Sequence, residues 1–431
     1  MKIKTLKKSY DEVASLPRPE HKKPSRPWFL LRTLIRALSV PDMLQTHFSY
    51  TFEGKKDLPD GPYLILMNHS SFIDLKIVSK IFYPMPYAIV CTSDGLVGKN
   101  WLMRRIGCIP TQKFVTDITL IKDIKYALKK KKISVLMYPE ASYTFDGCAT
   151  PLPEKLGGLL KMMNVPVIMI KTHGAFARNP LYNGLKQRKV NVTAEVKCIL
   201  TPEQIESKSV SELDAVLKEE FTFDNFAWQQ ENKIEIAENF RADGLERILY
   251  KCDACGAEGT MHGKGTEIVC SACGRKHTLD RFGHLRAKDG ETRFSHIPDW
   301  YAWERECVKE ELLSGNYSLE TDVEIGMMVD YKAIYMVGEG HLSHSENGFS
   351  LRGCNGKLVY DQKPLSSYGL YSDYYWYEIA DMICIGNRDA LYYCFPKKEG
   401  VVAKTRLAAE ELYKLRAAES RTKKAVNTAK E

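Results

Sequence analysis

The sequence of 431 residues contains no run of about 18 apolar residues, the length that a transmembrane helix requires. Its first eight residues include four lysines and lack the apolar core of a secretory signal. With 44% hydrophobic residues, the chain can still build about two to four folded domains. We therefore expect a cytoplasmic protein that associates with a membrane only peripherally, at its surface.

The sequence also lacks the cysteine pattern of a disulfide framework, although it contains 12 cysteines. Eight of them are scattered and are expected to be reduced thiols. The other four form two Cys-x-x-Cys-Gly motifs with fourteen residues between them: Cys252, Cys255, Cys270 and Cys273. Two thiolates from each motif can complete a tetrahedral metal site. This spacing predicts a zinc ribbon with a structural Zn²⁺ ion, and iron is the alternative metal.

The region around these cysteines has no unusual basic excess and few aromatic residues between residues 248 and 290. The electrostatic footprint of nucleic-acid binding is therefore weak, and no nucleic-acid partner is expected. Three nearby histidines, His262, His277 and His284, are expected on the surface of the ribbon rather than among the metal ligands.

The net charge of +8 is concentrated at the two ends of the chain. Residues 1–32 contain nine Lys and Arg against three Asp and Glu, and residues 402–431 contain eight against four. Basic ends suit an anionic membrane surface, nucleic acid or simply solvent. One face of a predicted helix over residues 28–38 is apolar and consists of Trp28, Leu31, Leu34, Ile35 and Leu38. We expect this helix either to lie in a membrane interface or to pack on the protein's own core.

A histidine and a carboxylate stand five residues apart at a predicted strand-to-helix turn. Residues 63–67 read as a buried strand, and residues 72–83 have helical apolar spacing. His69 lies in the turn, and Asp74 lies in the first helical turn. The carboxylate can accept a hydrogen bond from one ring nitrogen and leave the other nitrogen free as a general base. Such a pair can deprotonate an alcohol substrate, although the same residues also fit an ordinary capped turn.

Four sequence blocks decide between these two interpretations. They are Asn-His-Ser-Ser-Phe-Ile-Asp at residues 68–74, Gly-Cys-Ile-Pro-Thr-Gln-Lys at residues 107–113, Tyr-Pro-Glu-Ala-Ser at residues 138–142 and Val-Pro-Val-Ile-Met-Ile at residues 165–170. In type and order they resemble the conserved blocks of the glycerophospholipid acyltransferases, the family that includes the 1-acylglycerol-3-phosphate acyltransferases. The resemblance spans about residues 45–220. It implies an α/β fold and acyl transfer from acyl-CoA or acyl carrier protein to a hydroxyl of a lysophospholipid.

The resemblance also assigns residue roles. It implies that His69 is the general base and that Asp74 orients it. It implies an acceptor site lined by Gly107, Lys113, Pro139, Glu140 and Ser142, in which Lys113 holds a phosphate. The third block departs from the family pattern, because Tyr143 stands where an arginine is usual. Tyrosine cannot supply that charge, so a lipid acceptor without a phosphate is an alternative.

The patterns divide the chain into four segments. They are a basic amphipathic segment at 1–45, an acyltransferase-like domain at 46–245, a zinc ribbon at 246–290 and a β-rich domain at 291–431. Alternating strand and helix patterns in the second segment predict a mainly parallel sheet flanked by helices. In the last segment, short Tyr-rich runs predict an antiparallel sheet, and residues 405–424 predict a closing helix. This order of elements is similar to that of pleckstrin-homology domains.

Taken together, the sequence predicts a peripheral membrane acyltransferase of phospholipid biosynthesis. Its expected partners are membrane lipids and the acyl donor, which includes the possibility of an acyl carrier protein. A second hypothesis is a catalytically degenerate acyltransferase-like scaffold whose ribbon and β domain bind nucleic acid or protein. Salt-dependent binding to DNA or RNA without acyl transfer would favour this second hypothesis.

Overall fold

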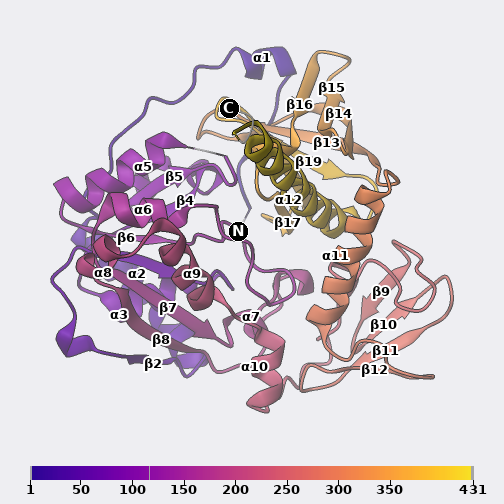
Figure 1. Cartoon of the computed structure of the whole chain (residues 1–431), viewed down its shortest axis with the longest axis horizontal. Coiled ribbons are helices and arrows are strands. Elements are labelled where there is room, and N and C mark those ends of the chain that lie inside the picture. Colours follow the sequence, from indigo (N-terminus) through magenta and orange to yellow (C-terminus); the bar gives the residue numbers. More distant parts are fainter. Residues whose placement is uncertain (1, 116, 429–431) are drawn as a thin grey trace.

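The computed structural model describes residues 2–115 and 117–428. Its largest part is an α/β unit around a seven-stranded sheet (Figure 1). The strand order is β2 (Ser49–Phe52), β8 (Thr193–Leu200), β7 (Val167–His173), β3 (Leu64–Met67), β6 (Ser134–Met137), β4 (Tyr87–Thr92) and β5 (Cys108–Thr111). Every neighbouring pair is parallel except β7 and β8. The sheet is therefore mixed, with the parallel majority that the alternating pattern predicts.

Helices cover both faces of this sheet, because its central strands are apolar on both sides. One face packs against α5 (Ile118–Lys125), α6 (Leu156–Met163), α8 (Pro202–Ser207) and α9 (Val210–Phe221). The other face packs against α2 (Phe29–Gln45), α3 (Asp74–Phe82) and α4 (Asn100–Ile106). Two further helices of the unit are α7 (Ala175–Arg178) and α10 (Asn225–Glu231).

The segment with the four clustered cysteines folds as four antiparallel strands. Their order is β12 (Leu285–Ala287), β11 (Lys276–Leu279), β10 (Glu267–Cys270) and β9 (Met261–Lys264). His277 on β11 is fully buried, so its expected position on the surface is wrong. A nitrogen of its ring lies 3.2 Å from a carboxylate oxygen of Asp253, and the ring meets Trp300 edge-on at 5.0 Å between ring centres. Trp300 belongs to α11 (Ile297–Leu313), so His277 helps to pack this four-stranded segment onto the helix.

A second large sheet follows α11 and contains the predicted Tyr-rich strands. Its order is β16 (Leu358–Gln362), β15 (Gly348–Gly353), β14 (Ile334–Ser345), β13 (Leu319–Met328), β19 (Leu391–Pro396), β18 (Ala380–Gly386) and β17 (Tyr371–Trp376). All neighbours in this series are antiparallel, as expected. The long helix α12 (Val401–Thr428) lies beside α11 and packs on the sheet through buried residues such as Leu407 (Figure 1).

The N-terminal segment, expected as a lead-in of residues 1–45, contributes to both units. β1 (Thr5–Lys7) pairs in parallel with β14 and adds an eighth strand to the C-terminal sheet. The short helix α1 (Tyr10–Ala14) follows, and its Val13 is buried in the C-terminal core. In contrast, α2 packs on the α/β sheet. The first 45 residues therefore connect the two units rather than precede them.

The apolar face of α2 differs from the expected one. Leu30, Leu34 and Leu38 are 77%, 52% and 64% exposed and follow one another at four-residue spacing. Leu31 and Ile35 were expected on the same face, but both are half-buried, and Ile35 faces residues of α3 and β4. Within the described part of the chain, no helix has both the length and the apolarity to cross a bilayer.

Candidate active site

The turn that contains His69 connects β3 to α3 at the carboxyl end of the parallel strands. Asn68 ties this turn to β7, the neighbouring strand. Its side-chain carbonyl accepts hydrogen bonds from the N–H and the hydroxyl of Thr172, at 2.9 and 3.1 Å. Its amide donates to the carbonyl of Thr172 at 3.3 Å. The backbone N–H and carbonyl of Thr172 are thereby both hydrogen-bonded to the turn, which limits how far His69 can move.

His69 and Asp74 form the hydrogen bond that their spacing predicts. Nδ1 of His69 lies 3.0 Å from Oδ2 of Asp74. The same oxygen accepts hydrogen bonds from the backbone N–H groups of Ser70 and Ser71, at 3.1 and 3.2 Å. A carboxylate can only accept, so Nδ1 of the ring carries the proton. The lone pair of Nε2 is then free to accept a proton from a substrate.

The His69 ring lies between two tyrosines. Its centre is 4.2 Å from the ring centre of Tyr138 and 4.0 Å from that of Tyr143. Burial lowers the pKa of His69, against the opposing effect of Asp74. Burial also raises the pKa of Asp74, although His69 and two backbone donors oppose that shift. Both shifts disfavour an ion pair, so the resting pair holds a neutral imidazole that can act as a base.

Glu140 holds the His69 turn rather than facing open space. One of its oxygens accepts from the backbone N–H of His69 at 2.9 Å. The other accepts from the N–H and the hydroxyl of Thr150, at 2.8 and 3.1 Å. Burial raises the pKa of Glu140 to about 7, while these donors favour the ionised form. Glu140 thus lies next to the His69 turn, with both of its oxygens already engaged within the protein.

The remaining residues of the predicted acceptor site are not all together. Ser142 is buried near Glu140, and Pro139 is buried between Tyr138 and Glu140. Gly107 instead ends α4 with a φ of 104°, where a Cβ would approach a ring carbon of Pro27 to 2.6 Å. This glycine therefore has a backbone role at the start of β5. No interaction between Gly107 and the His69 turn is observed within residues 2–115 and 117–428.

Lys113 follows β5 and meets the C-terminal sheet. Its Nζ lies 4.2 Å from the ring centre of Tyr371, whose hydroxyl donates to Asp94 at 2.5 Å. Burial lowers the pKa of Lys113, and the charges of Asp373 and Asp94 oppose this shift. The positive charge of Lys113 in turn lowers the pKa of His69. Lys113 is thus close enough to the candidate base for its charge to lower the pKa of His69.

The C-terminal unit contributes two residues that sequence reasoning missed, Asp373 and Arg406. Arg406 on α12 is only 3% exposed, and its Nη2 donates to the hydroxyl of Ser142 at 3.1 Å. Its Nε donates to Glu410 at 3.1 Å. Its Nη1 is buried and has no hydrogen-bond partner among the described residues. Arg406 lies 264 residues after Ser142, and no local pattern in the sequence indicates that they meet.

The four clustered cysteines come together in space. Their sulfur atoms all lie within 4.8 Å of one another. Cys252 and Cys273 are 3.7 Å apart, and Cys255 and Cys270 are 3.8 Å apart. A tetrahedral ion with metal–sulfur bonds of about 2.3 Å places its sulfurs about 3.8 Å apart, so these residues fit a metal ion. Four thiolates fill every position of such a site, which indicates a structural role.

Comparison with known proteins shows that part of the chain matches a protein family. The family model described as Acyltransferase matches residues 49–171, from β2 into β7. This segment contains His69, Asp74, Lys113 and Glu140, and the predicted resemblance to acyltransferases is confirmed for it. Residues 49–171 are therefore an acyltransferase domain.

Structural comparison gives a distant similarity. The chain is similar to the crystal structure of the 1-acyl-sn-glycerophosphate (LPA) acyltransferase PlsC from Thermotoga maritima, at 15% identity and a TM-score of 0.35. The match covers 44% of this chain and 78% of that chain. No curated protein matches the chain.

The cysteine cluster generates a prediction about metal content. Freshly purified protein is expected to contain one metal ion per chain, measured by elemental analysis. Removal of the ion with a chelator should increase hydrogen exchange in residues 252–285, because the thiolates then repel one another and the short ribbon loses its central bonds. Exchange in β3 and α3 should stay unchanged, because these elements have a separate core. Fresh protein without bound metal would contradict this prediction.

Proposed function

We propose that the protein transfers a fatty acyl group from a thioester donor to a hydroxyl of a glycerolipid, such as a lysophospholipid in phospholipid biosynthesis. The observation that carries this proposal is the His69–Asp74 hydrogen bond inside an acyltransferase domain. It leaves one ring nitrogen available as a base beside a buried carboxylate. An acyl-CoA or an acyl carrier protein would supply the thioester.

In the proposed mechanism, Nε2 of His69 removes the proton of the acceptor hydroxyl as its oxygen attacks the thioester carbonyl. Asp74 stabilises the imidazolium that forms and keeps the ring oriented. When the carbon–sulfur bond breaks, His69 returns the proton to the departing thiolate. The products are an ester and a free thiol, and no covalent acyl-enzyme is needed. Ser70 and Ser71 support this step by donating their backbone N–H groups to Asp74.

A phosphate on the acceptor is supported by two cations, the half-buried Lys113 and the buried Arg406. The charge of Lys113 lowers the pKa of His69, and the charge of Arg406 lowers the pKa of Lys113. Arg406 also hydrogen-bonds Ser142, the residue before Tyr143. The third block therefore has a cation beside it, although that cation comes from α12. Arginine and lysine are the usual partners of phosphate oxygens.

The remaining proposals concern metal and membrane. We propose that Cys252, Cys255, Cys270 and Cys273 hold Zn²⁺, which four thiolates at these distances favour, and that the ion stabilises the ribbon without taking part in acyl transfer. We also propose a peripheral membrane association. It is supported by the exposed stripe of Leu30, Leu34 and Leu38 on α2 and by the exposed basic residues that precede it.

The base is tested by replacement of His69. His69→Ala should lower turnover by about 10²- to 10⁴-fold without unfolding the protein, because general-base help is lost. Asp74→Asn should cost less, because the base itself remains. Acyl transfer to a panel of lysolipids is measured by mass spectrometry. His173→Ala is a matched control, since His173 also pairs with a carboxylate, Glu195 of β8, but lies at the end of β7 and outside the His69 turn. Wild-type turnover by folded His69→Ala protein would refute the mechanism.

The acceptor site generates a prediction about pH. Burial raises the pKa of Asp373 to about 7, and Lys113 opposes this shift. Below this pH the carboxyl group is protonated and leaves Lys113 free for the acceptor phosphate. Above it the ionised Asp373 competes for Lys113. The KM for a phosphate-bearing acceptor, taken relative to an Asp373→Asn variant, should therefore rise on the order of fivefold between about pH 6.5 and 8.5.

Two controls accompany this measurement. The ratio to Asp373→Asn removes the effect of the acceptor's own phosphate titration. Lys113→Met should raise the acceptor KM more than the donor KM and should abolish the pH effect. An acceptor KM that is independent of both substitutions would exclude Lys113 as a phosphate ligand and favour a non-phosphate acceptor.

Membrane association is tested with liposomes. Leu34→Glu with Leu38→Glu should weaken sedimentation with anionic liposomes, because two exposed apolar side chains become charged. Binding of the wild type should fall with rising salt, since Lys22, Lys23 and Arg26 each contribute about 1 kcal/mol near an anionic surface. Leu313→Glu with Val359→Glu is the control, because these residues are equally exposed elsewhere. A double variant of α2 that sediments like the wild type would exclude this helix as the anchor.

A further inference from the structure

One aromatic ring of the C-terminal unit contacts both a cation and a carboxylate of the acyltransferase domain. The ring belongs to Tyr371, the first residue of β17, and it is buried. Nζ of Lys113 lies 4.2 Å from the centre of the ring, within the range of a cation–π contact. The hydroxyl of the same ring donates to Oδ2 of Asp94 at 2.5 Å. Tyr371 therefore contacts one charge through its ring and the opposite charge through its hydroxyl.

The hydrogen bonds of Tyr371 fix the direction in which its hydroxyl points. Nε1 of Trp376 donates to the hydroxyl oxygen at 3.0 Å, so the hydroxyl accepts from Trp376 and donates to Asp94. Burial holds the pKa of Tyr371 well above its usual value, so the hydroxyl keeps its proton. Asp94 is only 2% exposed, and a buried carboxylate that lost this donor would attract another partner.

Lys113 is the cation that the carboxylate would attract. Burial lowers the pKa of Lys113, and the charges of Asp373 and Asp94 oppose that shift, so both carboxylates act on the ammonium group. Within residues 2–115 and 117–428, the ammonium makes neither a hydrogen bond nor an ion pair, and its contact is with the ring of Tyr371. An ammonium held on an aromatic ring keeps its N–H donors for an anion.

We infer that Tyr371 is a positioning residue that keeps Lys113 ready for an anionic group of the substrate, because its ring holds the ammonium while its hydroxyl engages Asp94. This inference rests on the proposed function, in which Lys113 binds the phosphate of the acceptor. It adds that recognition of this phosphate depends on the C-terminal unit. The acyltransferase domain supplies the cation, and β17 of the other unit prevents a neighbouring carboxylate from capturing it.

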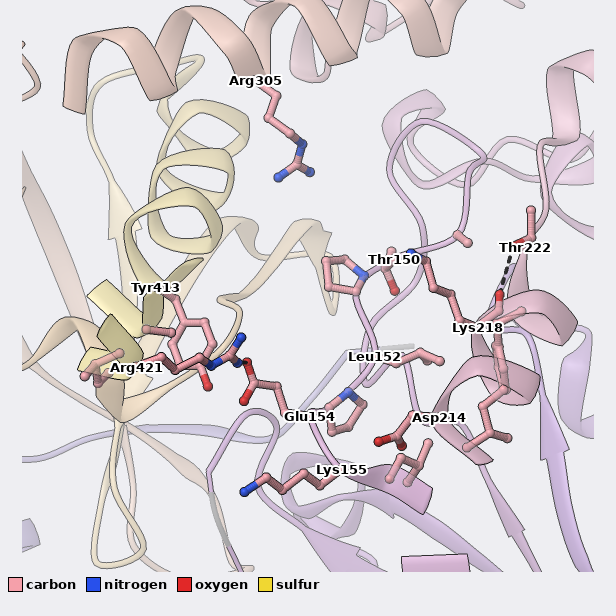
Figure 2. Close-up of a pocket in the computed structure, with 18 of the residues that line it drawn as sticks. Thr150, Leu152, Glu154, Lys155, Asp214, Lys218, Thr222, Arg305, Tyr413 and Arg421 are labelled. Atoms are coloured by element: carbon pink, nitrogen blue, oxygen red, sulfur yellow. Dashed lines mark hydrogen bonds and ion pairs between the residues drawn. The ribbon is translucent and has the colours of Figure 1, made fainter. Parts of the chain in front are cut away.

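A second border between the two units provides a structural control. A groove of about 1000 Å³ lies there, between the loop of residues 149–156, α9 and α12 (Figure 2). Figure 2 shows Arg421 of α12 directed at Glu154 of the loop, with 2.5 Å between Nη2 and Oε1. Neither Lys113 nor Tyr371 lines this groove. Loss of the ion pair would therefore remove a contact between the units without changing the surroundings of Lys113.

Tyr371→Phe keeps the ring and removes the hydroxyl. At about pH 6.5, below the pKa of about 7 of Asp373, this variant should raise the acceptor KM on the order of tenfold, because Asp94 then competes for Lys113. The donor KM and kcat should stay unchanged. Addition of Asp94→Asn should restore the acceptor KM, since the competing charge is gone and the ring remains. Tyr371→Leu with Asp94→Asn should not restore it, because the ring is absent.

Two control variants separate positioning from a general loosening of the interface. Tyr374→Phe removes a buried hydroxyl from the same strand, but this hydroxyl donates to the backbone carbonyl of Arg247. Arg421→Gln removes the ion pair at the groove. Both variants should keep the wild-type acceptor KM. A rise in either control as large as that of Tyr371→Phe would overturn the inference, because it would show that any weakened contact between the units has this effect.

Binding of octyl phosphate, measured by calorimetry, tests the same contact without turnover, because this probe carries the anion but no acceptor hydroxyl. Tyr371→Phe should weaken its binding on the order of tenfold, and addition of Asp94→Asn should restore it. The uncharged octyl glucoside should bind all variants equally.

The outcomes distinguish this inference from the proposed function. If Tyr371→Phe leaves the acceptor KM and octyl phosphate binding unchanged while Lys113→Met alters both, the inference is overturned and the phosphate contact stands. If Lys113→Met alters neither, the phosphate contact fails and the inference fails with it. If Tyr371→Phe weakens octyl phosphate binding but the wild type transfers no acyl group, the proposed function fails and the positioning of Lys113 stands.

Discussion

The buried carboxylate of Glu140 is the contact on which the rest of the candidate site depends. One oxygen accepts from the His69 backbone, and the other accepts twice from Thr150. The position of the base and the position of the loop that carries Thr150 are therefore set by the same side chain. A buried N–H group left without a partner costs about 1 to 3 kcal/mol, so loss of this carboxylate would loosen both loops together. Glu140 is better described as a positioning residue than as a substrate ligand.

The C-terminal unit completes the surroundings of this contact. Arg406 reaches Ser142 from α12, and Tyr371 and Asp373 reach Lys113 from β17. These charged groups are buried only while the two units remain packed together. Separation would leave Arg406 and Glu410 to be solvated anew and would expose Phe145, which lies 4.2 Å below the guanidinium of Arg406. The acyltransferase domain of this chain is therefore not an independent unit.

The parts of the site that could be predicted from the sequence depend on short separations along the chain. His69 and Asp74 are five residues apart, and one strand-to-helix turn brings them together. Each pair of clustered cysteines lies in one turn. The parts that could not be predicted depend on packing between distant segments. No local pattern indicates that Arg406 meets Ser142, that His277 packs on Trp300 or that Leu34 of α2 stays exposed while Leu31 is half-buried. Some strands of both large sheets were predictable from their apolar runs, such as β3, β6 and β19, whereas the parallel pairing of β1 with β14 was not.

The unusual third block and the appended C-terminal unit have a common physical explanation. The ring of Tyr143 packs at a tilt against the His69 ring, with 4.0 Å between the ring centres, and helps to bury it. An arginine at that position would add positive charge next to the base. Such a charge would lower the pKa of His69 further and weaken it as a proton acceptor. In this protein Arg406 of α12 supplies the cation instead, and it contacts Ser142 rather than His69. The arrangement keeps a positive charge near the proposed acceptor site while an aromatic ring, rather than a guanidinium, contacts the base.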